Sequence, residues 1–226
     1  MISNNIKKIS DRIETKCAHL GRDGSEITLI AVSKNFGVDE IREALNCGIK
    51  NFGENKAQEL KEKFEILKDD VIWHFVGHLQ TNKVKYAVKA ANYIHSVDSI
   101  KLAAEINRTA EKLQKKINVL LEIKTSEEAT KVGLSDFDKI IETAEFCNKS
   151  DFLNLKGLMT IAPFTDDEKE VRKSFIELRT LKEKMNLQGF NLTELSMGMT
   201  SDFEIALEEG ATMLRIGTAI FGHRSY

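Results

Sequence analysis

The chain alternates between short, continuously apolar runs and longer stretches in which apolar residues recur every three or four positions. Short runs of this kind are typical of strands that are buried on both faces, and the longer stretches are typical of covering helices. The pattern therefore predicts a parallel sheet with connecting helices. A helix before the first strand is expected over residues 5–20, where one face carries Ile6, Ile9, Ile13, Cys17 and Leu20.

Eight strands are expected in all. They lie near residues 27–33, 51–53, 73–76, 93–96, 118–123, 155–160, 194–197 and 213–216. The helices that follow them are expected near residues 38–46, 55–67, 81–90, 99–115, 136–147, 167–185 and 201–209. Eight parallel strands close most naturally into a barrel, and no Gly-x-Gly-x-x-Gly turn of a doubly wound sheet follows Val32. The sequence predicts an α/β fold, a single (β/α)8 TIM barrel with an extra N-terminal helix, over residues 1–226.

Composition narrows the class of protein. The 226 residues are 42% hydrophobic and 30% charged, which is typical of a globular protein with a sizeable core. The net charge of −2 argues against binding of nucleic acid or an anionic membrane. The three cysteines lack Cys-x-x-Cys spacing, so neither a disulfide framework nor a zinc site is indicated. Without a signal-peptide pattern or an apolar membrane span, we expect a cytoplasmic protein, and we expect it to be a monomer.

Lys34 stands at the end of the first apolar run. In a barrel of this kind, functional residues lie on the loops that follow the carboxyl ends of the strands. A lysine there forms a Schiff base with an aldehyde when partial burial beside other positive groups lowers the pKa of its amine. The alternative is a lysine that only extends from the strand end into water.

Residues 196–202 connect the seventh expected strand to a helix. They offer hydroxyl groups at Ser196 and Thr200, together with the backbone N–H groups of a helix start, which bind anions. An ordinary helix cap by Ser201 or Asp202 is the alternative.

Arg215, Gly217 and Thr218 end the eighth expected strand, where Gly217 lets the backbone approach a ligand closely. Barrels commonly bind phosphate with the loops after the seventh and eighth strands, so the two segments together predict one phosphate site. For Arg215, a structural ion pair near the rim is the alternative.

Two histidines lie in or after the third expected strand. His74 falls within the strand and can be a core histidine with satisfied hydrogen bonds, whereas His78 lies on the loop and can face a pocket. Neither has partners at the spacing of a metal site, so we predict that no metal is bound.

Several motifs at the strand ends resemble one family in the same order along the chain. They are Ala31-Val32-Ser33-Lys34, Phe52-Gly53-Glu54-Asn55, residues 74–83, Gly157-Leu158-Met159-Thr160, residues 195–200 and residues 215–222. These motifs resemble the YggS/PROSC pyridoxal phosphate homeostasis proteins. The resemblance implies a barrel similar to the N-terminal domain of alanine racemase, with pyridoxal 5'-phosphate (PLP) as the cofactor.

The resemblance also implies roles for individual residues. Lys34 would form a Schiff base with PLP, Arg215 would face the pyridine nitrogen and Asn55 would line the ring. Lys131 matches a family lysine that contacts a substrate or a second vitamer, with a solvated loop charge as the alternative. The phosphate would be surrounded by Ser196, Gly198, Thr200, Gly217 and Thr218.

An arginine at the pyridine nitrogen disfavours protonation of the ring, which weakens the ring as an acceptor of carbanion electrons. We therefore expect a protein that captures, buffers or hands over PLP, to PLP-dependent apoenzymes among others, without strong turnover. One alternative is a weak PLP-dependent amino-acid racemase or transaminase-like enzyme. Others are a barrel aldolase that acts on a phosphorylated sugar through a Schiff-base lysine, and a regulatory module whose partners sense its loaded state.

Overall fold

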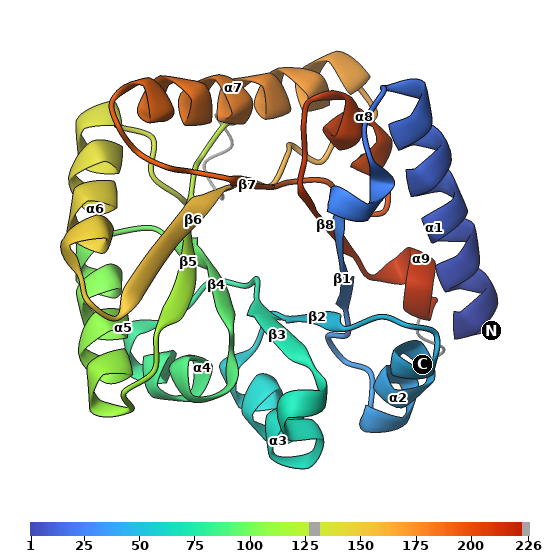
Figure 1. Cartoon of the computed structure of the whole chain (residues 1–226), viewed down its shortest axis with the longest axis horizontal. Coiled ribbons are helices and arrows are strands. Elements are labelled where there is room, and N and C mark those ends of the chain that lie inside the picture. The colour runs from blue at the N-terminus through green and yellow to red at the C-terminus, as the bar shows by residue number, and fades with distance from the viewer. Residues whose placement is uncertain (127–131, 223–226) are drawn as a thin grey trace.

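The computed structural model describes residues 1–126 and 132–222, and within them eight parallel strands pair in chain order and close into a barrel (Figure 1). Closure follows from β1 pairing with both β2 and β8. The predicted (β/α)8 barrel is confirmed. Its strands are β1 (Thr28–Val32), β2 (Asn51–Glu54), β3 (Ile72–Phe75), β4 (Tyr93–Val97), β5 (Ile117–Glu122), β6 (Leu153–Met159), β7 (Glu194–Ser196) and β8 (Met213–Ile216).

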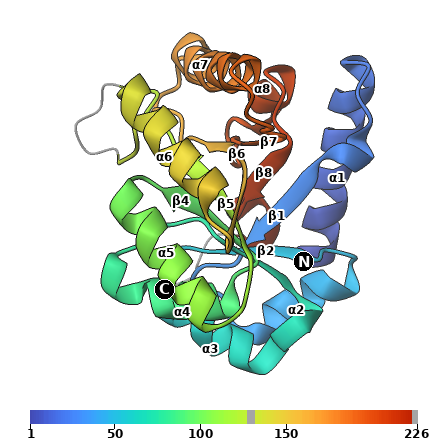
Figure 2. The same cartoon turned by 60° about the vertical axis from the view of Figure 1, so that its left-hand side comes forward.

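The α-helices surround the barrel (Figure 2). In the described residues they are α1 (Ile2–His19), α2 (Val38–Asn46), α3 (Ala57–Leu67), α4 (Val84–Ala90), α5 (Ile100–Lys112), α6 (Phe137–Lys149), α7 (Glu168–Leu187), α8 (Phe203–Glu208) and α9 (Thr218–Phe221). The helix expected over 81–90 begins as a 3-10 turn, Thr81–Lys83, and the helix expected over 201–209 is shorter at both ends. The short helix α9 was not predicted.

The strands bury apolar side chains on both faces. Outside the barrel, one large apolar core lies between the strands and the helices. Inside the barrel, Ile30, Leu120, Met159 and Met213 form a separate, much smaller cluster. Because this cluster fills only part of the interior, polar side chains occupy the rest of it, and they are described with the site below.

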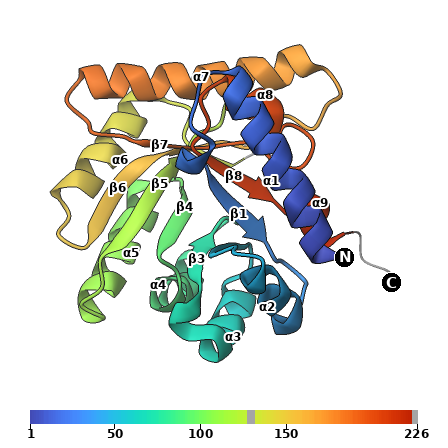
Figure 3. The same cartoon turned by 45° about the vertical axis from the view of Figure 1, so that its right-hand side comes forward.

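Helix α1 packs against α8 and α9, next to the point where the barrel closes (Figure 3). Its buried face contains Ile2, Ile6, Ile9, Ile13 and Cys17. The spacing predicted all of these but Ile2, and it wrongly included Leu20, which follows the helix and is exposed. No helix in the described ranges is both long and apolar enough to span a membrane.

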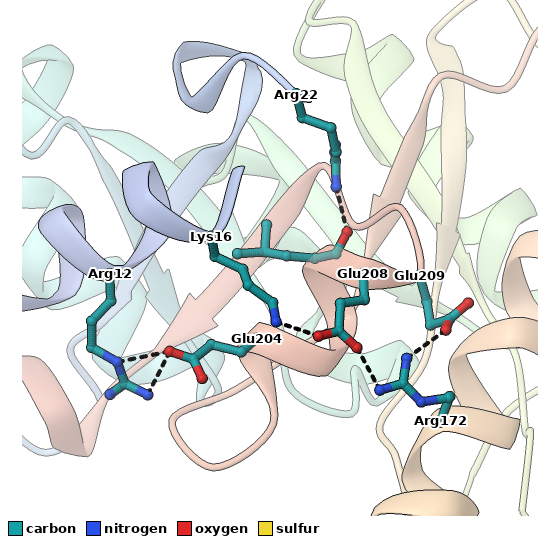
Figure 4. Close-up of polar contacts among 8 residues, drawn as sticks. Arg12, Lys16, Arg22, Arg172, Glu204, Glu208 and Glu209 are labelled. Carbon is teal, nitrogen blue, oxygen red and sulfur yellow. Dashed lines mark hydrogen bonds and ion pairs between the residues drawn. The ribbon is translucent and has the colours of Figure 1, made fainter. Parts of the chain in front are cut away.

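Ion pairs connect the polar edge of α1 to α8, and a further ion pair connects α8 to α7 (Figure 4). Arg12 contacts Glu204 at 2.9 Å, and Lys16 contacts the carboxylate of Glu208. The same carboxylate also contacts Arg172 of α7. Glu208, the last residue of α8, therefore contacts both α1 and α7.

We expect Glu208→Gln to lower the free energy of unfolding by about 1 kcal/mol, because one partly exposed carboxylate serves two cations. The loss should shrink in concentrated salt, which screens such pairs. Urea unfolding at low and high ionic strength measures both effects, with Glu14→Gln, an exposed carboxylate of α1, as the control. Equal stability of the two variants at low salt would contradict the assignment.

Candidate functional site

Barrel closure places the end of β1 beside the end of β8. Ile30 pairs with Arg215, and Ala31 pairs with Ile216. At the next position along each chain segment, Gly217 lies against Val32, because a Cβ atom added to Gly217 would be 3.3 Å from the carbonyl oxygen of Val32. The segment that carries Lys34 therefore leaves the barrel next to the turn between β8 and α9.

The turn between β7 and α8 meets the same region. Gly198 has a φ of +94°, and a Cβ there would lie 2.6 Å from the Cβ of Ala206, so a larger residue would not fit. The hydroxyl oxygen of Thr200 accepts a hydrogen bond from the backbone N–H of Ala219 at 3.3 Å, which joins this turn to the start of α9. The structure thus brings together Gly198, Thr200, Gly217 and Thr218, while their role as phosphate ligands stays a prediction.

One of the backbone donors expected in this turn already has a partner. The carboxylate of Asp202, the residue before α8, accepts a hydrogen bond from the N–H of Met199 at 2.5 Å. Asp202 occupies the N-cap position of α8, but its side chain makes no capping hydrogen bond to the helix and closes the preceding turn instead. Hydroxyl groups and the remaining backbone of both turns are left to contact an anion.

Lys34 is exposed at the rim of the barrel, in the turn that follows β1. Exposure is what the simple surface lysine shows, and the partial burial expected of a Schiff-base lysine is not seen. The residue is accessible to a small aldehyde, and its role as a covalent tether stays a prediction.

Arg215 points into the barrel and is only 5% exposed. Its guanidinium donates to the hydroxyl oxygen of Ser196 at 2.7 Å and to the carbonyl oxygen of Thr160 at 2.8 Å. Burial lowers the pKa of Arg215 to about 10, so the group remains charged at neutral pH. It is therefore a fixed cation held mainly by neutral acceptors, rather than a surface ion pair at the rim.

The hydroxyl of Ser196 continues into a chain of buried side chains. Its oxygen lies 2.9 Å from Nδ1 of His95, Nε2 of His95 lies 2.9 Å from Nδ1 of His74, and Nε2 of His74 lies 3.0 Å from Oδ1 of Asn51. Burial lowers the pKa of both histidines, that of His74 to about 3, so both rings are neutral.

Only one arrangement of protons then fits this chain. Arg215 donates to Ser196, Ser196 donates to His95, His95 donates to His74, and His74 donates to Asn51. His74 is thus the satisfied core histidine that its place in a strand suggested. Ser196 accepts from Arg215 and donates to His95, so its hydroxyl holds Arg215, and its role as a phosphate ligand stays a prediction.

Asn55 follows β2 at the same rim. Its Oδ1 atom is buried and has no hydrogen-bond partner among the residues that the structure describes. Gly77 allows the loop after β3 to approach it, since a Cβ at that position would lie 2.3 Å from the carbonyl oxygen of Asn55. A buried polar atom without a partner is uncommon and suits a group that contacts a ligand.

Glu122, at the end of β5, is a site residue that the sequence did not single out. It is 8% exposed, and its Oε2 atom lacks a hydrogen-bond partner within the described ranges. Burial and the charge of Asp98 raise the pKa of Glu122 to about 7, although Arg215 acts in the opposite direction. An acidic residue at the end of an otherwise apolar strand was the available signal.

His78 and Lys131 complete the predicted set. His78 is half exposed, and its Nδ1 atom lies 3.6 Å from a carboxylate oxygen of Asp98. Lys131 lies outside the described residues.

The groups described here fit a ligand that carries an aldehyde and a phosphate. The exposed Lys34 follows Val32, whose carbonyl group borders Gly217 in the first of two joined turns. The guanidinium of Arg215 is a fixed cation inside the barrel, and Oδ1 of Asn55 is an acceptor without a partner among the described residues. PLP carries an aldehyde and a phosphate-bearing arm on neighbouring ring carbons, with the ring nitrogen opposite the aldehyde, so the residues present are compatible with it.

We expect Glu122→Gln to change how stability depends on pH. In the wild type, the folded pKa of about 7 exceeds the ordinary 4.5, so this group stabilises the fold below pH 4.5 and the contribution is lost as pH rises to 7. Relative to wild type, the variant should therefore gain on the order of 2 kcal/mol between pH 5 and pH 8. Urea unfolding at both pH values tests this, with Glu142→Gln, an exposed carboxylate, as the control. A difference that is equal at both pH values would refute the assignment.

Comparison with known proteins places this site in a family. The family model described as "Alanine racemase, N-terminal domain" matches residues 3–225. A pyridoxal phosphate homeostasis protein of Aquifex aeolicus is 41% identical over 98% of this chain and 97% of its own length. PipY of Synechococcus elongatus, solved with PLP bound, superposes with a TM-score of 0.82 at 37% identity, over 93% of this chain and 100% of that one.

A protein of Bifidobacterium adolescentis described as unknown superposes still more closely, with a TM-score of 0.91 at 34% identity, over 97% of this chain and 94% of that chain. These matches cover nearly the whole of this chain and of the proteins compared, and the family model includes every residue proposed for the site. The chain therefore belongs to the family of pyridoxal phosphate homeostasis proteins, whose barrel is that of the alanine racemase N-terminal domain.

Proposed function

We propose that this protein binds PLP through a reversible Schiff base on Lys34 and takes part in PLP homeostasis without strong catalytic turnover. The observation that carries the proposal is the pairing of β1 with β8, which sets Lys34 beside the joined turns of Gly198, Thr200, Gly217 and Thr218. The names of its relatives and the PLP bound to PipY support the same ligand.

Lys34 supplies the covalent contact. Its amine nitrogen adds to the aldehyde carbon of PLP, a C=N bond forms and a water molecule leaves, so that water can reverse the reaction. Because Lys34 is exposed, both the cofactor and water reach the amine without opening the barrel. Gly198, Thr200, Gly217 and Thr218 are proposed to bind the phosphate, and Asn55 to contact the ring.

Arg215 limits what the bound cofactor can do. Its guanidinium is charged and fixed by Ser196 and Thr160, and we propose that it faces the pyridine nitrogen. Two adjacent positive charges repel each other, so this nitrogen stays unprotonated and the ring is a weak electron acceptor. Ser196 then acts on the cofactor through Arg215. These features favour a carrier over an enzyme.

We also infer the setting of this activity. The protein is proposed to act in the cytoplasm as a monomer, with residues 1–226 forming one domain. PLP-dependent apoenzymes are proposed to receive the cofactor from it. Other vitamers of B6 that carry the phosphate would compete for the same two turns.

Weak amino-acid racemisation is a second candidate function, and Glu122 is the observation that favours it. A buried carboxyl group with a pKa near 7 can accept and donate a proton at neutral pH. The fold is also that of the alanine racemase N-terminal domain.

Prolonged incubation of the PLP-loaded protein with L-alanine separates the two functions. We expect the handedness of the amino acid to stay unchanged, as measured by chiral chromatography. Sustained formation of D-alanine that Glu122→Gln abolishes would establish the racemase instead.

The tether itself is tested by borohydride reduction of the protein in the presence of PLP, followed by peptide mass spectrometry. We expect a stable adduct on the peptide that contains Lys34, and at least a tenfold loss of adduct in Lys34→Ala, because Lys34 follows the strand that pairs with β8 and is the proposed tether. Lys56→Ala removes another exposed lysine of the same rim and serves as the control. An adduct that remains in Lys34→Ala, or none in the wild type, would overturn the proposal.

A further inference from the structure

Lys34 lies within a tight turn. The carbonyl oxygen of Ser33 accepts a hydrogen bond from the N–H of Phe36 at 3.0 Å, which closes a four-residue turn with Lys34 and Asn35 at its centre. Asn35 has a φ of +68°, a backbone conformation that residues other than glycine seldom adopt. A turn of this type needs support from its surroundings.

An ionic cluster of Lys63, Glu54 and Glu59 supports this turn. Lys63 of α3 is buried, and its amine donates to Oε1 of Glu54 at 2.6 Å and to Oε1 of Glu59 at 2.8 Å. The third contact of this amine is the carbonyl oxygen of Ser33, at 2.8 Å. All three donors of the ammonium group therefore have acceptors.

The two carboxylates of the cluster reach the same turn. Oε1 of Glu54 accepts a hydrogen bond from the hydroxyl of Ser33 at 2.6 Å, and Oε1 of Glu59 accepts one from the backbone N–H of Asn35 at 2.6 Å. The cluster thus fixes the residue before Lys34 and the residue after it, and leaves the side chain of Lys34 exposed.

Attachment of α3 to the barrel does not explain this cluster. Ala57, Leu60 and Leu67 already bury the apolar face of α3 against the core. Burial of the ammonium of Lys63 and the carboxylate of Glu54 costs free energy, and apolar side chains of similar volume usually stabilise a core as well or better. What the ionic cluster adds is a defined direction for each hydrogen bond. Within the described residues, the side-chain hydrogen bonds that leave the cluster end on Ser33 and Asn35, in the turn that carries Lys34.

We propose that Lys63, Glu54 and Glu59 form a positioning cluster that fixes the direction in which the side chain of Lys34 leaves the barrel. The inference rests on the proposed function, since it assigns to the cluster the placing of the PLP-binding amine. Glu59 is the member best suited to a test, because its side chain is 21% exposed and its removal leaves Glu54 and Lys63 paired.

The test compares Glu59→Ala, which removes the acceptor, with Glu59→Gln, which keeps an oxygen at the same place. Glu62→Ala is the control, since Glu62 is exposed one turn further along α3 and bonds to Gln58. The first measurement, made without PLP, is hydrogen exchange at the backbone amide of Asn35. We expect exchange about tenfold faster in Glu59→Ala, and near the wild-type rate in Glu59→Gln and Glu62→Ala.

The second measurement is the rate at which borohydride traps PLP on Lys34 at a PLP concentration well below saturation. We expect a fall of about fivefold to tenfold in Glu59→Ala, recovery in Glu59→Gln, and no change in Glu62→Ala. Faster exchange with unchanged trapping would overturn the proposal, and so would unchanged exchange. If borohydride traps no PLP on the wild-type protein, the proposed function and this inference are both wrong. If the wild type is trapped and only the results for the variants differ from expectation, the inference alone is wrong.

Discussion

The pairing of β1 with β8 is the constraint on which the rest of the site depends. These strands come from opposite ends of the sequence, and their register places Ile30 beside Arg215. The contact between Gly217 and the end of β1 follows from that register. Helix α1 and its ion pairs with α8 lie next to this junction, so the N-terminal helix stabilises the region where the barrel closes.

Polar groups inside the barrel serve to hold one charge. The guanidinium of Arg215 has neutral acceptors at Ser196 and Thr160, and Ser196 is in turn oriented by His95. Such a chain costs stability compared with an apolar filling, because each buried polar atom must find a partner. This loss of stability is accompanied by a functional gain, since the position and hydrogen-bond directions of the Arg215 cation are set before any ligand binds.

The sequence predicted the parts of the site that depend on local pattern. Lys34 and Gly217 stand at the ends of apolar runs, and the (β/α)8 alternation is enough to place such residues on one rim. The contact of Ser196 with His95 joins residues 101 positions apart, and no periodicity reveals it. Glu122 was missed because its apolar run identified a strand but not its last residue as functional. The four-residue helix α9 is too short to show a helical period.

The two cations of the site are held in opposite ways. For Arg215 the side chain is fixed and buried, whereas for Lys34 the backbone is fixed by Glu54, Glu59 and Lys63 while the side chain stays exposed. If Arg215 faces the ring nitrogen as proposed, it would weaken the ring as an acceptor of carbanion electrons. The proposed bond of PLP to an exposed amine would be one that water can reach and reverse. Both arrangements disfavour turnover and favour capture and release, so the two halves of the rim support the same proposed function.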